Sequence, residues 1–91
     1  MDSIEIPPEI RSRYLERRQR DLEILQGALQ RKSFDEFKRI GHQLKGNAAS
    51  FGYLELADIA VAMEKAAAAS NAQEAAQVLN RFLSWLRSAC H

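Results

Sequence analysis

Hydrophobic residues recur every three or four positions along most of the chain, which is the spacing of one apolar side of a helix. The first run extends from Pro8 to about Lys32, with apolar residues at Ile10, Tyr14, Leu15, Leu22, Leu25 and Leu29. Proline is tolerated in the first turn of a helix because its missing N–H has no helical partner there. We therefore expect a helix to begin near Pro8, after a short N-terminal arm of residues 1–6.

The second run predicts a helix from about Phe34 to Ser50. Its core side combines Phe37, Gly41, Leu44, Ala48 and Phe51, with Phe34 and Ile40 at the margins. Ser33 and Glu36 fit a capping box, in which each side chain accepts a backbone N–H of the first helical turn. Gly52 follows directly, where a glycine in the left-handed conformation commonly ends a helix.

Two more helices are predicted in the last part of the chain, at 54–69 and from Asn71 to about Ser88. The first turns Leu56, Ile59, Ala60, Met63 and Ala67 inward, and the second turns Ala75, Val78, Leu79, Phe82, Trp85 and Leu86 inward. Asn71 and Glu74 again have the spacing of a helix cap. Four amphipathic helices with short connections predict an all-α, antiparallel up-down-up-down four-helix bundle that forms a single domain over residues 1–91.

The composition narrows the class of protein. Thirteen lysines and arginines nearly balance twelve aspartates and glutamates, so the net charge gives no long-range attraction to nucleic acid or to an anionic membrane. The single cysteine, Cys90, cannot form an internal disulfide, which fits a reducing compartment. Since no apolar run reaches the roughly 18 residues of a membrane span, we expect a cytoplasmic protein without a membrane partner.

Five arginines lie close together near the start of the first predicted helix, at Arg11, Arg13, Arg17, Arg18 and Arg20. On a helix with about 100° per residue they scatter around the circumference, so they do not form one basic face. A solvated helix surface is the favoured interpretation. A nucleic-acid contact through this arginine-rich helix stays open as an alternative function.

The segment from Gly41 to Gly52, GHQLKGNAASFG, holds the strongest candidate chemistry. His42 lies about 140° from Phe37 around the helix axis, away from the core side and toward solvent. Its neighbours on the helix surface are Lys38, Lys45, Gly46 and Ala49. Glycine costs about 1 kcal/mol in a helix interior, so Gly46 suggests that another molecule approaches the backbone beside His42.

This group of residues suits an imidazole that accepts a phosphoryl group. The ammonium of Lys45, with help from Lys38, would neutralise phosphate oxygens. A zinc site or a hydrolytic triad is disfavoured because no further ligand or nucleophile stands at a suitable helical spacing from His42. The chain also lacks a glycine-rich nucleotide loop, so we expect no autonomous kinase activity and no bound cofactor. The metal and the acidic residues for transfer would come from a partner.

The motif around His42 continues with Leu44 and Gly52 in the same segment, and with Leu56, Met63 and Glu64 in the helix predicted after it. Together with His42, Lys45 and Gly46, these residues resemble the core motif of the histidine-containing phosphotransfer (HPt) domains of bacterial two-component phosphorelays. The region before them also looks like the first helix of that family, so the resemblance covers nearly the whole chain. Asn47 and Met63 depart from the commonest pattern, where serine and leucine are frequent.

The resemblance implies a monomeric bundle in which His42 receives a phosphoryl group from a receiver-domain aspartate and passes it to another receiver. Lys45 would stabilise the phosphate, Gly46 would provide clearance, and Mg²⁺ would be held by the receiver. The expected docking residues are Lys38, Arg39, Gln43, Ala49 and Ser50. A non-catalytic helical module that docks on a receiver remains the main alternative.

Overall fold

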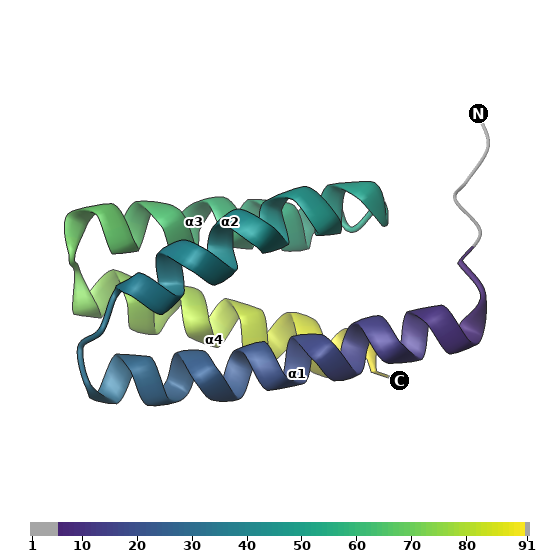
Figure 1. Ribbon diagram of the computed structural model, residues 1–91, viewed down its shortest axis with the longest axis horizontal. Helices are drawn as coiled ribbons and strands as arrows, with labels where there is room; N and C mark the ends of the chain where they lie inside the picture. Colours follow the sequence, from purple (N-terminus) through teal and green to yellow (C-terminus); the bar gives the residue numbers. More distant parts are fainter. Residues whose placement is uncertain (1–5, 91) are drawn as a thin grey trace.

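The computed structural model describes residues 6–90, and this part of the chain contains four helices and no strand (Figure 1). The helices are α1 (Pro8–Gln30), α2 (Asp35–Ser50), α3 (Leu54–Ala69) and α4 (Ala72–Ala89). The prediction of an all-helical fold with four helices is confirmed. Residues 1–5 of the predicted arm, and His91, lie outside the described residues.

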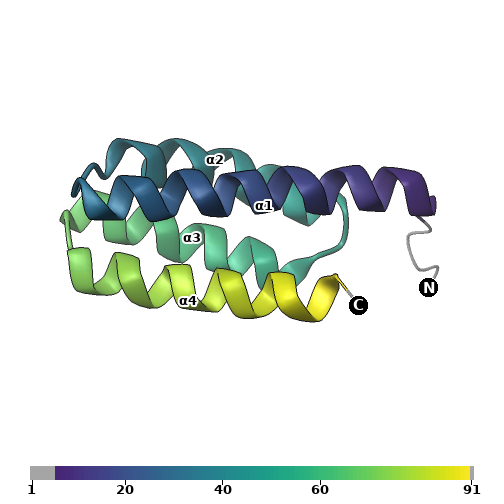
Figure 2. The same ribbon diagram turned by 90° about the horizontal axis from the view of Figure 1, so that it is seen from below.

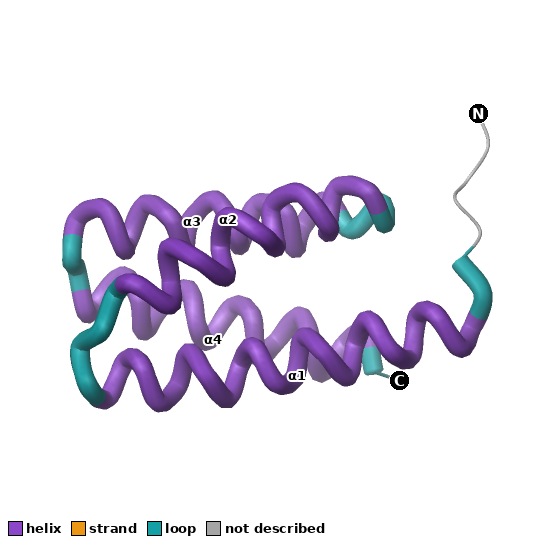
Figure 3. Tube along the Cα trace, in the orientation of Figure 1, coloured by secondary structure: helices purple, strands orange, loops and turns teal. Residues whose placement is uncertain are grey.

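Successive helices run back and forth along the long axis of the molecule, joined by short connections at its two ends (Figures 1 and 3). Helix α2 packs most extensively on α3, and α4 packs on both α1 and α3 (Figure 2). The first turns of α1 project past the ends of the other helices (Figure 1). Helices α2 and α3 therefore form one side of the molecule, and α1 and α4 form the opposite side.

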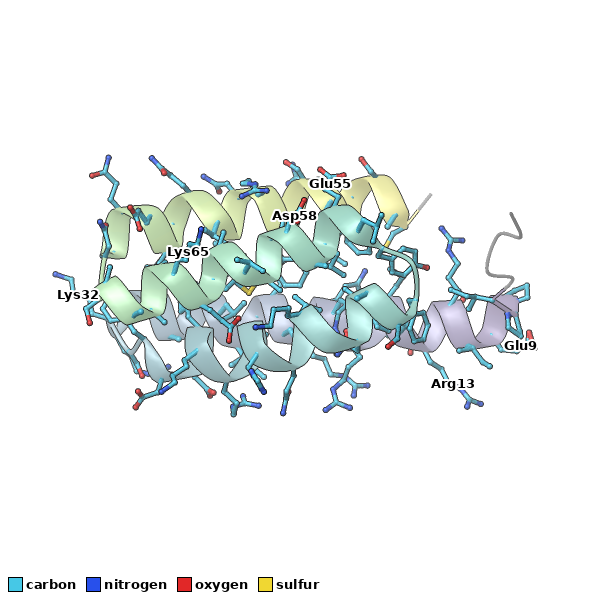
Figure 4. All side chains as sticks on the ribbon, turned by 90° about the horizontal axis from the view of Figure 1, so that it is seen from above. Glu9, Arg13, Lys32, Glu55, Asp58 and Lys65 are labelled. Atoms are coloured by element: carbon cyan, nitrogen blue, oxygen red, sulfur yellow. The ribbon has the colours of Figure 1, made fainter. Side chains whose placement is uncertain are left out.

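The core is formed by side chains from all four helices. The largest fully buried ones are Phe37, Phe82, Leu25, Ile40, Leu44, Leu56, Ile59 and Met63. The predicted apolar sides are largely correct, but Ile10 is 46% exposed, since it lies in the projecting first turn of α1 beside Glu9 (Figure 4). Ala28 and Ala66 are fully buried although neither was expected inside, because tight packing admits small side chains between helices.

The helix ends show which local predictions hold. Gly52 has a φ of 80°, and the Asn71 side chain accepts the N–H of Glu74 at 3.0 Å, both as predicted. The capping box at Ser33 and Glu36 is wrong: residue 34 is the N-cap of α2, and no side chain caps that end. The Ser33 N–H instead donates to the Ala28 carbonyl at 2.8 Å, so Ser33 completes the end of α1.

A buried polar cluster on α1, which reaches α2 through Asn47, was not predicted. It comprises Tyr14, Arg18, Asp21 and Asn47, and we call it the Tyr14 cluster. Arg18 is 7% exposed, pairs with Asp21 at 2.8 Å and places its guanidinium 4.5 Å from the Tyr14 ring centroid. The Tyr14 hydroxyl donates to Asn47 Oδ1 at 2.6 Å, and burial raises the pKa of Tyr14, so the donor stays protonated.

The Tyr14 cluster corrects the expectation that all five arginines of α1 lie on a solvated surface. Arg18 is buried, and Arg11 donates to the Ala89 carbonyl at 2.8 Å, which ties the start of α1 to the end of α4. Arg18 is thus enclosed in the domain, whereas Arg11 stays exposed and forms a contact between two helices. Arg13, Arg17 and Arg20 remain exposed.

Candidate functional site

The imidazole of His42 projects from the middle of α2 into solvent. Its side chain is 76% exposed, whereas the neighbouring core residues Gly41 and Leu44 are buried. The helical periodicity of the sequence predicts this orientation, because Phe37, Leu44 and Ala48 turn the other side of α2 into the core. The ring is therefore open to another macromolecule while its backbone is fixed by the bundle.

Glu64 of α3 joins His42 and Lys45 into one group. Its Oε2 lies 3.5 Å from His42 Nδ1, and its Oε1 lies 3.0 Å from Lys45 Nζ. Our sequence interpretation described an imidazole flanked only by cations and left Glu64 without a place in the site. The match of Glu64 to the family motif was the available signal, but helical spacing along one helix cannot reveal a contact from the next.

The charge on Glu64 is stabilised where it lies. The hydrogen bond from Lys45 holds the pKa of the Glu64 carboxyl below its ordinary value, against the opposing effect of partial burial. Glu64 is thus an ionised acceptor near neutral pH. Because Nδ1 of His42 faces this carboxylate, Nε2 is the ring nitrogen left available for reaction.

Two glycines of α2 have opposite surroundings. A Cβ on Gly41 would come within 3.0 Å of both the Ala60 carbonyl oxygen and Met63 Cβ, so this glycine allows α2 to approach α3 closely. A Cβ on Gly46 would meet nothing within 4 Å. Gly46 therefore has no packing role inside the domain, and it leaves open space on the surface one turn after His42.

The other predicted site residues all lie on the exposed surface of α2. Arg39 is engaged with Glu36 at 2.7 Å, and the Ser50 hydroxyl donates to the Gly46 carbonyl at 3.2 Å. Gln43 and Ala49 are exposed, and Lys38 lines a surface cleft together with Glu64. These residues share the exposed surface of α2 with His42. Of the predicted site residues that the structure describes, Lys45 is the one linked to His42 by polar contacts, through Glu64.

Within residues 6–90, no group of three or more histidine, cysteine or acidic side chains is arranged to hold a metal ion. None of the helices in the same residues is both long and apolar enough to cross a membrane. Cys90 is exposed and free, and Gln19 Nε2 donates to its Sγ at 3.4 Å.

The family model for the Hpt domain matches residues 9–89 of this sequence. The chain belongs to the Hpt domain family. This finding confirms the resemblance that the motif around His42 indicates, and it places the protein among the phosphotransfer modules of two-component phosphorelays. Neither a comparison with curated proteins nor one with solved structures found a match to this Hpt domain.

Proposed function

We propose that this Hpt domain carries a phosphoryl group between the aspartates of receiver domains, with His42 as the phosphoacceptor. The observation that supports the proposal most directly is the 76% exposed imidazole of His42, whose Nδ1 faces the ionised Glu64. An exposed ring held at one nitrogen presents the other as a nucleophile in a defined direction. The rigid bundle supplies that direction without enclosing the reaction.

In the transfer step, the receiver brings a phosphoryl group joined to an aspartate oxygen. The lone pair of His42 Nε2 forms a bond to phosphorus as the bond between phosphorus and the aspartate oxygen breaks, and that oxygen keeps the electron pair as a carboxylate. The proton on Nδ1 stays in place beside Glu64, whose negative charge stabilises the positively charged phosphorylated ring. Transfer to a second receiver reverses these bond changes.

Two further residues of α2 have roles in this proposal. Lys45, held 3.0 Å from Glu64, lies one turn after His42, where its ammonium can turn to the phosphate oxygens. Gly46 leaves room for the receiver's catalytic loops, since nothing lies within 4 Å of the position of its missing Cβ. The receiver would supply Mg²⁺ and the acidic residues that bind it, so the Hpt domain acts as a carrier without kinase activity of its own.

Incubation with a ³²P-labelled receiver domain tests the proposal. We expect an acid-labile, base-stable label on the wild-type chain and none on His42→Gln. The matched control is His91→Gln, which removes the other of the two histidines and should label normally. No label on the wild type, or equal labelling of His42→Gln, would contradict the phosphoacceptor role and favour a module that only docks.

A further inference from the structure

Four exposed arginines lie on one outward side of α1. The other two arginines of this helix, Arg11 and Arg18, make contacts within the domain. Residue 31 is the C-cap of α1 and keeps a helical backbone conformation, so its side chain can be placed on the same helical wheel. At about 100° per residue, the exposed arginines fall within a sector of about 60°. They are Arg13, Arg17, Arg20 and Arg31.

Two exposed isoleucines accompany these arginines. Ile10 is 46% exposed and Ile24 is 39% exposed, and both lie within a sector of about 80° that includes the four arginines. We call the four arginines and two isoleucines the α1 stripe. No acidic residue falls in its sector, and at 1.5 Å per residue the α1 stripe is about 30 Å long.

The positive charges of the α1 stripe are not neutralised by neighbouring acids. None of its four arginines forms a salt bridge within residues 6–90, although Glu16 stands four residues before Arg20, a spacing that allows a pair. A Cβ on Gly27 would lie 3.3 Å from Arg31 Nη1, so the Arg31 side chain lies back along α1. Arg13 projects away from the bundle (Figure 4). The α1 stripe therefore presents a row of unpaired guanidiniums.

The mixture of arginine and isoleucine favours a partner that offers phosphate and hydrocarbon together. An anionic lipid bilayer does so, because its phosphates lie at the surface and its acyl chains begin just below. Long arginine side chains can keep their charge at the phosphates while apolar neighbours go deeper. Nucleic acid also offers phosphates, but contacts to its backbone leave the isoleucines unused, and the α1 stripe has no aromatic side chain to stack on bases.

The position of α1 suits contact with a flat surface. Its first turns project past the ends of the other helices, so Ile10 is free of the rest of the bundle (Figure 1). The flank of α2 toward α1 carries Asn47, which contacts Tyr14, whereas His42 contacts Glu64 on the flank toward α3. A surface that lies along α1 would therefore leave the imidazole accessible.

We propose that the domain binds the surface of an anionic lipid bilayer through the α1 stripe, with the arginines at the lipid phosphates and Ile10 and Ile24 at the edge of the hydrocarbon. The contact is peripheral and reversible. The near balance of charges over the whole chain led us to expect no membrane partner, but that sum averages over a local row of four cations. Binding at the α1 stripe is independent of phosphotransfer at His42.

The double variant Arg17→Gln/Arg20→Gln tests the charged part of the α1 stripe. Glutamine and arginine have similar helix propensities, and circular dichroism verifies that all variants remain folded. The matched control is Arg81→Gln/Arg87→Gln, which removes two exposed arginines from α4 and gives the same net charge. Co-sedimentation over a range of lipid concentrations measures the partition coefficient on vesicles of equal parts phosphatidylglycerol and phosphatidylcholine.

We expect the partition coefficient of Arg17→Gln/Arg20→Gln to fall about 30-fold, since each arginine near an anionic surface contributes about fivefold. The α4 control should stay within about twofold of the wild type, because its charges lie farther from the lipid than the screening length. His42→Gln should bind as the wild type does. Wild-type binding should weaken with added salt and be lost on vesicles of phosphatidylcholine alone.

The variant Ile24→Gln tests the apolar part of the α1 stripe. Its control is Val61→Gln, which makes the same kind of change at a 37% exposed residue of α3. We expect the partition coefficient to fall about fivefold for Ile24→Gln, because part of one isoleucine is no longer buried in the lipid. Val61→Gln should bind as the wild type does. Binding to a duplex DNA oligonucleotide is measured in parallel.

Three results would overturn the lipid contact. The first is a wild-type chain that does not bind the anionic vesicles. The second is an equal loss for the α1 and α4 arginine pairs, because binding would then follow net charge alone. The third is tighter binding to the oligonucleotide than to the vesicles with no effect of Ile24→Gln, which would make the α1 stripe a nucleic-acid contact.

Discussion

Two acid–base pairs of this Hpt domain have similar lengths and very different surroundings. Arg18 and Asp21 lie 2.8 Å apart with side chains 8% and 13% exposed, inside the Tyr14 cluster. Lys45 and Glu64 lie 3.0 Å apart with side chains 47% and 26% exposed, beside His42. The first pair lies within α1 and is buried, whereas the second joins α2 to α3 and is partly exposed to solvent.

The difference in burial determines how much free energy it costs to separate each pair. A buried charge loses its hydration, so removal of its partner leaves an unpaired charge and strongly destabilises the fold. An exposed pair contributes about 0–1 kcal/mol because water and salt screen it. Separation of Lys45 from Glu64 therefore costs little, so Lys45 could turn to a phosphate in the proposed transfer, whereas Arg18 cannot leave Asp21 without loss of stability.

The largest effect is expected for Asp21→Ala, which leaves the Arg18 guanidinium buried without its acid. The free energy of unfolding should fall by about 3 kcal/mol, measured by urea denaturation. Glu23→Ala removes an exposed acid from the same helix and should change stability by less than about 0.5 kcal/mol. Similar losses for the two variants would show that burial does not distinguish the Arg18–Asp21 pair.

The second effect concerns rate. Lys45→Ala should slow transfer from a receiver about 30-fold, equivalent to about 2 kcal/mol of transition-state stabilisation from one charged donor. Its unfolding free energy should stay within about 1 kcal/mol of the wild type, because the pair is exposed. The control is Lys65→Ala, which removes another exposed lysine from the α2–α3 pair of helices. Equal rates for Lys45→Ala and the wild type would remove the assigned role of Lys45.

The two glycines of α2 provide the third test. Gly46→Ala should raise the free energy of unfolding by about 1 kcal/mol, because alanine is the better helix former and its Cβ meets no neighbour. Gly41→Ala should lower it, since its Cβ would press on Ala60 and Met63. Urea denaturation measures both changes.

Gly46→Leu adds bulk at the same open position and tests the clearance role through the rate. The helix should be at least as stable as in the wild type, while receiver-dependent transfer slows. Labelling by phosphoramidate, a small phosphoryl donor that needs no docking surface, should stay normal. Normal transfer from the receiver would show that clearance is not the role of Gly46.

The smallest effect is the pH dependence of the Lys45–Glu64 pair. The pKa of Glu64 lies below its ordinary value because Lys45 donates a hydrogen bond to it. A carboxyl with a lowered pKa in the folded state stabilises the protein above the ordinary value of about 4.3, and this contribution is lost as the pH falls through the lower folded value. Glu64→Gln should therefore be less stable than the wild type near pH 7, by under about 1 kcal/mol.

Urea denaturation at stepwise lower pH measures this difference between Glu64→Gln and the wild type, which should shrink below about pH 4. Lys45→Gln removes the cause of the lowered pKa and should show the same reduced dependence on pH. A constant difference from pH 7 to 3 would argue against the pair as the source.

Periodicity within each helix predicted much of this structure. The bounds of α3, the end of α2 at Ser50 and the outward direction of His42 follow from spacing within one segment. Contacts between segments were missed, because the sequence pattern of one helix does not specify which residue of another lies opposite. Glu64 beside His42 and Asn47 beside Tyr14 are such contacts. The prediction that Ser33 caps the next helix was wrong because its N–H donates to a carbonyl at the C-terminal end of α1.

Gly41 offers a way to vary the distance between the two helices of the candidate site. Its missing side chain sets the separation of α2 and α3, and these two helices carry the two sides of the contact between His42 and Glu64. Gly41 thus acts as a spacer between the helices that carry His42 and Glu64. Larger side chains at position 41 would push α2 away from α3 and so lengthen the distance between His42 and Glu64. No group proposed to react would itself be altered.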